Sequence, residues 1–134
     1  MNLADLDRFV ARRWDEDLLP QLIDYVRVPA KSPAFDASWE AHGHLKAVIQ
    51  AAEQWCRAQP ISGLKLEIVT IDGLTPCLFF DVPATAGLGD DRTVLFYGHL
   101  DKQPEMVGWR EDLGPWKPVY EDGKPYGRGS GDDG

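Results

Sequence analysis

The chain has 134 residues, of which 43% are hydrophobic and 27% are charged, which is enough for one globular domain but not comfortably for two. This composition is typical of a folded, soluble protein rather than of a disordered one. The formal net charge of -8 argues against a nucleic-acid partner, because the neutralisation of phosphates requires clustered lysine and arginine side chains.

The N-terminus carries acidic residues where a secretory signal needs a basic start and an apolar run, and no stretch approaches the length of a membrane span. We therefore expect a cytoplasmic protein with no membrane partner. Cys56 and Cys77 lie far apart and fit no paired-cysteine metal pattern. Buried free thiols are expected in place of a disulfide.

Apolar residues recur at helical spacing in residues 3–14 and again in residues 18–26. This pattern predicts two helical segments. Asp15 or Asp17 is a candidate N-cap for the second segment, and Pro20 is tolerated in its first turn, where the missing N–H has no intrahelical partner.

Residues 39–59 repeat apolar side chains at steps of four and three, which predicts one amphipathic helix that covers a sheet. Three strands are predicted after it, at residues 64–71, 77–82 and 93–98. The fold class is therefore α/β. Glycine and proline are so frequent after residue 98 that we expect a long loop there, and loops of that length usually carry function.

A histidine and an aspartate, His99 and Asp101, directly follow the third predicted strand. Open α/β sheets bind ligands at the carboxyl ends of their strands, so this position favours a site. In an extended backbone, side chains two residues apart point the same way, and Asp101 can accept a hydrogen bond from the His99 ring nitrogen that does not hold a metal. Alone, such a pair is more often an ordinary strand end.

A second cluster strengthens the case for a metal site. The glycine-rich residues 126–134 include the adjacent carboxylates Asp132 and Asp133. Glycines permit a close approach of the backbone, and one carboxylate there can bridge two cations. A solvated turn is the bland alternative. A calcium loop is disfavoured, because its ligands at alternate positions are missing. A dinucleotide-binding loop is disfavoured as well, because its third glycine is missing.

Together, the sequences YGHLDKQP, GWREDLGPWKP and YGRGSGDDG resemble the M20 metallopeptidases, a family that includes carnosinase-like dipeptidases, aminoacylases and succinyl-diaminopimelate desuccinylases. The resemblance is close across residues 94–134, and LIDYVRVPAKSP extends it upstream. It implies that residues 1–134 are the N-terminal portion of a three-layer αβα zinc-peptidase catalytic domain, without the family's lid and dimerisation domain.

The resemblance further implies that a complete active site holds two zinc ions, or manganese or cobalt in their place. His99 would bind one metal, Asp132 would bridge the two, and Asp101 would be the catalytic residue that orients His99. The expected reaction is hydrolysis of a dipeptide-like or related amide bond by zinc-activated water. The expected partner is a small peptide or an N-acyl amino acid, and the full-length protein is expected to be a homodimer.

Two residues depart from the family pattern, because Lys102 stands where many relatives carry an apolar residue and Gly134 where many carry lysine. The motif wording favours a dipeptidase, with an N-acyl-amino-acid deacylase or desuccinylase as the alternative. The family's glutamate base and further ligands lie downstream, so we expect the 134-residue chain alone to be inactive. A non-catalytic, cation-binding remnant is the competing hypothesis.

The other histidines and the tryptophans of the long loop receive simpler interpretations. His42 and His44 lie two residues apart on a predicted helix, so they do not share a face and are not expected to be joint ligands. Trp109 and Trp116 are expected to pack the loop against the domain, because burial is the commoner use of aromatic area.

Overall fold

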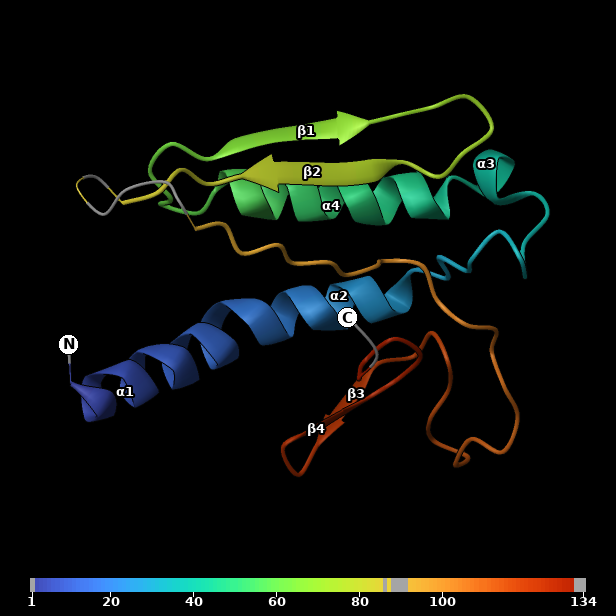
Figure 1. The fold of residues 1–134 in the computed structure, drawn as a ribbon. Coiled ribbons are helices and arrows are strands. Elements are labelled where there is room, and N and C mark those ends of the chain that lie inside the picture. Colours follow the sequence, from blue (N-terminus) through green and yellow to red (C-terminus); the bar gives the residue numbers. More distant parts are fainter. Residues whose placement is uncertain (1, 86, 88–91, 132–134) are drawn as a thin grey trace.

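The computed structural model describes residues 2–85, 87 and 92–131 (Figure 1). Within them the elements are α1 (Leu3–Arg13), the π-helical segment η1 (Trp14–Leu18), α2 (Leu19–Arg27), α3 (Trp39–His42), α4 (His44–Arg57), β1 (Lys65–Val69), β2 (Cys77–Asp81), β3 (Val119–Glu121) and β4 (Lys124–Tyr126). This part of the chain is a small mixed α/β structure with two separate antiparallel hairpins. It contains no helix that is both long and apolar enough to cross a membrane.

The N-terminal helix continues through the predicted break, because η1 joins α1 to α2 without a gap. The predicted capping by Asp15 or Asp17 is therefore wrong: Leu18 precedes α2 in a helical conformation, and no side chain caps it. Asp17 instead accepts a hydrogen bond from the indole of Trp55, at 2.9 Å, and so ties the helix to α4. Pro20 lies in the first turn of α2, as predicted.

The helix predicted for residues 39–59 is interrupted at Gly43, which adopts the left-handed conformation with a φ of 70°. Glycine reaches this conformation without the steric cost that a side chain imposes. The chain therefore turns between α3 and α4, and the rings of His42 and His44 lie 5.8 Å apart. The prediction that His42 and His44 do not share a helix face assumed an unbroken helix, and the turn at Gly43 brings their rings near each other; that they are not joint metal ligands stays a prediction.

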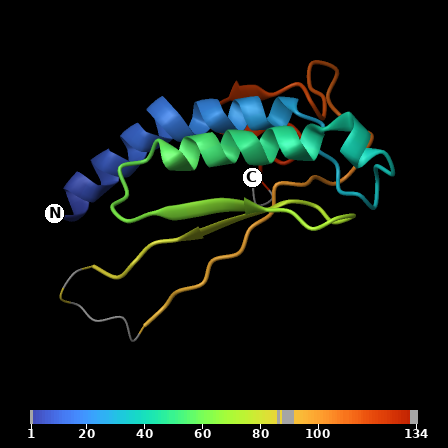
Figure 2. The same ribbon diagram turned by 90° about the horizontal axis from the view of Figure 1, so that it is seen from above.

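The core lies where α2, the turn after it and α4 meet. α2 and α4 run side by side, and α4 packs on the β1–β2 hairpin (Figures 1 and 2). The buried apolar residues are Val26, Ala30, Leu45, Val48 and Ile49, and the partly buried side chains packed against the central cluster are Tyr25, Val28, Trp39 and Leu100. Leu100 comes from the segment that carries the predicted site, so the core fixes that segment directly.

The first two predicted strands are present, and they pair antiparallel from Lys65 opposite Asp81 to Val69 opposite Cys77. The third predicted strand, residues 93–98, is absent: this segment is an extended coil that runs below β2 in the view of Figure 1. A strand requires a neighbour for its backbone N–H and C=O groups. Among the described residues none pairs with residues 93–98 in a sheet. The finer expectation of a three-layer αβα domain therefore remains a prediction.

The long loop after Gly98 contains a hairpin that the sequence analysis missed. β3 and β4 pair from Val119 opposite Tyr126 to Glu121 opposite Lys124. Asp122 and Gly123 form the turn with φ values of 51° and 75°. Two consecutive positive φ angles are typical of the tight type I′ turn, for which Asp-Gly is a favoured sequence.

Both cysteines are free, as expected, but their burial differs from the prediction. Cys56, in α4, is partly buried, whereas Cys77, at the start of β2, is exposed. The apolar character of the segment around Cys77 predicted burial. The hairpin leaves this end of β2 without a covering element among the described residues, so the thiol is accessible.

Candidate functional site

The predicted pair His99 and Asp101 lies at the end of the extended segment, next to the core residue Leu100. The ring Nδ1 of His99 is 3.1 Å from the carboxylate Oδ1 of Asp101 and 3.0 Å from its backbone oxygen. Both side chains are about one-third exposed, at 33% and 34%. A proton on Nδ1 would be donated to Asp101 and would put the ring's lone pair on Nε2, which is how a carboxylate orients a metal-binding histidine.

The donor chemistry of this pair fits zinc, which takes imidazole nitrogen and carboxylate oxygen as ligands. The second predicted ligand, Asp132, and its neighbour Asp133 lie outside the described residues. Among the residues that the structure describes, no three His, Cys, Asp or Glu side chains gather as a metal shell would require. Of the predicted site residues, the structure therefore brings together His99 and Asp101.

Lys102 follows the pair directly and is almost completely buried, with 2% of its surface exposed. Its ammonium group donates hydrogen bonds to the backbone oxygens of Tyr25, Val26 and Val28, at 2.7, 3.3 and 2.8 Å. These carbonyls lie at the C-terminal end of α2, where the helix dipole is negative; those of Tyr25 and Val28 also accept from the backbone N–H groups of Val28 and Ala30. Lys102 is thus a C-terminal cap supplied from 74 or more residues away.

Aromatic rings and the backbone complete the surroundings of Lys102. Its Nζ lies 3.9 Å from the centre of the Tyr25 ring and 5.4 Å from that of Trp116. Burial lowers the pKa of the Lys102 ammonium to about 8. Its backbone N–H donates to Ala30 at 2.8 Å, and its carbonyl accepts from Ser32 at 2.9 Å, so the segment is bound to the turn after α2 on both sides.

The glycine-rich loop, residues 126–131, packs on this same end of α2. A Cβ atom at Gly127 would lie 2.3 Å from Cγ1 of Val26, and one at Gly129 would lie 3.0 Å from Cε of Lys102. Both glycines have positive φ angles, 144° and 88°. The interpretation that these glycines permit close backbone approach is confirmed for α2 and Lys102, which the sequence did not identify as the neighbours.

The remaining polar contacts of the loop are internal or reach the preceding segments. The N–H of Arg128 donates to the carbonyl of Pro115 at 2.7 Å, and the hydroxyl of Ser130 donates to the carbonyl of Gly127 at 2.9 Å. The guanidinium of Arg128 lies 3.5 Å from the carbonyl of Gln103.

The two tryptophans of the long segment contact its own residues and Lys102. The indole N–H of Trp109 donates to the carbonyl of Glu105 at 2.9 Å, and its side chain is partly buried. Trp116 lies against the Lys102 ammonium. These contacts agree with packing as the use of both rings.

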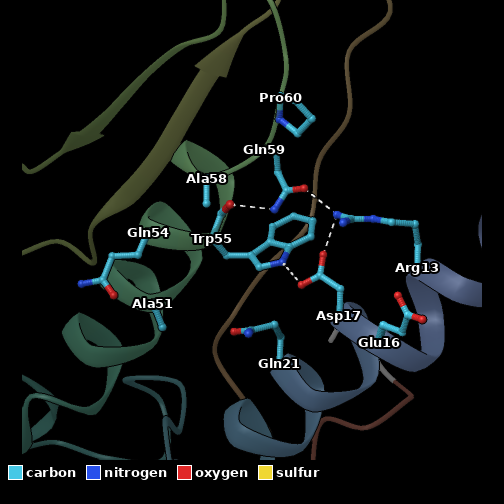
Figure 3. A pocket seen from close by; sticks show the side chains of 10 residues that line it. All are labelled: Arg13, Glu16, Asp17, Gln21, Ala51, Gln54, Trp55, Ala58, Gln59 and Pro60. Atoms are coloured by element: carbon cyan, nitrogen blue, oxygen red, sulfur yellow. Dashed lines mark hydrogen bonds and ion pairs between the residues drawn. The ribbon is translucent and has the colours of Figure 1, made fainter.

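A polar cavity of about 640 Å³ lies elsewhere, between η1 and the end of α4 (Figure 3). Arg13 bridges Asp17 and Gln59, at 2.5 Å to each, and the indole of Trp55 binds Asp17. Gln59 in turn donates to the carbonyl of Trp55 at 2.9 Å. The polar groups joined by dashed lines in Figure 3 thus bind one another across the two helices, which makes this network a structural tie.

No model of a known protein family matches the chain. The resemblance to the M20 metallopeptidases therefore remains a prediction that rests on the three sequence motifs.

Proposed function

We propose that this chain contributes a zinc ligand and its orienting carboxylate to a hydrolase that cleaves a peptide bond, with a dipeptide as the preferred substrate. His99 is the proposed ligand, Asp101 the orienting residue, and Asp132 a further ligand. The observation that supports this proposal is the 3.1 Å contact between Nδ1 of His99 and Oδ1 of Asp101 at the end of an extended segment. Zinc at such a site would supply activated water as the nucleophile.

Asp101 would act on the reaction only through His99. By accepting the Nδ1 proton it fixes the tautomer and the orientation of the ring, and it makes Nε2 a stronger electron donor toward a metal. Leu100, which packs against the core, fixes the backbone between the two residues. The partial exposure of both side chains leaves the pair accessible to a ligand from solvent.

The ligand role of His99 is tested by zinc analysis of the protein with His99→Ala. We expect the loss of zinc from one site and of most activity, because an open ligand position weakens metal binding. The matched control is His44→Ala in α4, which removes an imidazole outside the site and should retain both zinc and activity. Unchanged zinc content and turnover in His99→Ala would show that His99 is an ordinary residue at the end of an extended segment.

The role of Asp101 is tested by Asp101→Asn, which keeps the shape of the side chain and removes its charge. We expect zinc affinity to fall by about 10- to 100-fold, as is typical when the partner of a ligating histidine is changed. Asp112→Asn is the control, because Asp112 is an exposed carboxylate whose partner is Arg110. Chelator competition measures both, and equal affinities would refute the orienting role.

A further inference from the structure

We propose that Lys102 is a positioning residue, whose buried ammonium group fastens the His99–Asp101 segment and the glycine-rich loop to the C-terminal end of α2. The two stretches that carry the predicted ligands would then keep a fixed relation to each other. This inference rests on the proposed function, because it concerns the geometry of the same zinc site. It adds a residue that the sequence analysis noted only as a departure from the family pattern.

The burial of Lys102 indicates a specific use of its charge. A buried ammonium group is costly unless hydrogen bonds replace its water, and this one has three backbone acceptors for its three N–H donors. Three acceptors fix both the position and the direction of the group. An apolar residue would fill the same space, but the carbonyls of Tyr25 and Val28 would then keep only their backbone donors, the N–H groups of Val28 and Ala30.

The backbone of Lys102 fixes the segment that precedes it. Its N–H and C=O groups bind Ala30 and Ser32, which form the turn directly after α2. The hydroxyl of Tyr25 also lies 3.3 Å from the carbonyl of Leu100. Leu100 and Lys102, the neighbours of Asp101 on either side in the sequence, are therefore both bound to α2 or to the turn after it.

The side chain of Lys102 also supports the glycine-rich loop. Gly129 approaches so closely that an added Cβ would lie 3.0 Å from Cε of Lys102 and 3.1 Å from the ring of Tyr25. Trp116 closes the other side of the ammonium, at 5.4 Å. The loop leads directly into the predicted ligand Asp132 in the sequence, so its position on the lysine bears on both halves of the proposed site.

The test compares Lys102→Met with Lys31→Met in the protein that carries this chain. Methionine keeps an unbranched stem and removes the ammonium, and Lys31 is the residue paired with Lys102 in an isolated parallel bridge. Two quantities are measured: the hydrogen-exchange rates of the Arg128 and Ser130 amides, and zinc affinity by chelator competition. The amides of Val48 and Ile49 in α4 report whether the core remains folded.

We expect Lys102→Met to speed exchange at both loop amides and to weaken zinc binding by about 10- to 100-fold, while the α4 amides keep their protection. Lys31→Met removes an ammonium group that pairs with Glu105 at 3.0 Å, outside the glycine-rich loop, and it should change neither quantity. Equal loop exchange and equal zinc affinity in the two variants would overturn the inference. If wild type and His99→Ala bind zinc equally weakly, the proposed function fails, and the loop amides still decide whether Lys102 fastens the loop.

A second pair of variants keeps the inference testable if Lys102→Met does not fold. Gly129→Ala places a methyl group against the lysine stem, whereas Gly108→Ala imposes nearly the same backbone conformation, φ 86° against 88°, in open space. Weaker zinc binding and faster loop exchange are expected for Gly129→Ala alone. Identical behaviour of the two alanine variants would contradict a positioning contact at Lys102.

Discussion

The helical core and the extended segment of residues 94–97 are both apolar, and the structure treats them in opposite ways. Val26 is 0% and Leu45 is 5% exposed, whereas Leu95 and Tyr97 are 89% and 88% exposed. Two regions of similar hydrophobicity therefore differ in burial: the core residues are covered, and residues 94–97 are exposed. The difference teaches that burial depends on which partners an element finds as well as on its own residues.

The partners differ because the two kinds of element satisfy their backbones differently. A helix forms its hydrogen bonds internally, so α2 and α4 need only bring their apolar faces together. A strand must find a neighbour for its N–H and C=O groups before its side chains can be covered. The one partner strand of β2 in the described chain is β1, and residues 94–97 remain unpaired.

The largest effect is expected from a substitution in the buried core. Leu45→Ala should lower the free energy of unfolding by about 2–5 kcal/mol, because it removes buried methylene groups and leaves a cavity. The same substitution at the exposed Leu95 should change it by about 0.5 kcal/mol or less. Urea titrations of both variants measure the difference. Comparable losses would show that residues 94–97 are covered in solution.

The next prediction concerns how far the core extends. Gly127→Ala should destabilise the protein by about 1–3 kcal/mol more than Gly123→Ala, because its methyl group would overlap Val26. Gly123 also has a positive φ, 75° against 144° at Gly127, but its Cβ would meet no atom within 4 Å, so that variant has a backbone cost without an overlap. Similar losses in urea titrations would mean that the glycine-rich loop does not pack on α2.

The elements that follow from local periodicity were predictable, and those that depend on one residue or on a distant partner were not. The apolar spacing identified both helical regions and the two strands β1 and β2, but it did not predict that these strands pair with each other. The break at Gly43 and the turn at Asp122 and Gly123 depend on positive φ angles, which periodicity does not report. The Asp-Gly sequence was the available signal for the second turn.

The candidate site was predictable to a similar extent. The contact between His99 and Asp101 follows from their spacing, because it is local. The capping of α2 by Lys102 joins residues 74 and more positions apart, and no pattern along the chain encodes that pairing. The single hint was that Lys102 stands where many M20 metallopeptidases carry an apolar residue, and composition alone favours a solvated position for a lysine.

A smaller effect is expected at Asp36, which lies at the border of the core. Its carboxylate accepts hydrogen bonds from Nδ1 of His42 at 2.7 Å and from the N–H of Ser38 at 3.1 Å, and the contact with His42 holds its pKa below the ordinary value. The unfolded chain therefore takes up this proton first as the pH falls. The stabilisation is present above about pH 4, the unfolded pKa, and is lost as the pH falls through the folded pKa.

Urea titrations of wild type and Asp36→Asn from pH 7 to pH 3 test this prediction. Wild type should be the more stable at pH 7, and the difference should shrink toward acid pH. A difference in unfolding free energy that stays constant across this range would show that the ionised carboxylate of Asp36 does not contribute.

The smallest expected effect is a difference in reactivity between the two cysteine thiols, which is measured without changing the stability of the protein. Cys56 lies within α4, where burial raises its pKa, and Cys77 lies exposed at the start of β2. The thiolate is the reactive form, so iodoacetamide at pH 8 should label Cys77 first, as peptide mass spectrometry with Cys56→Ser and Cys77→Ser controls can show. Urea should abolish the difference, because unfolding exposes both thiols. Protection of Cys77 in the native protein would mean that another chain or segment covers the start of β2. The exposed apolar residues 94–97 would then be candidates for the same cover.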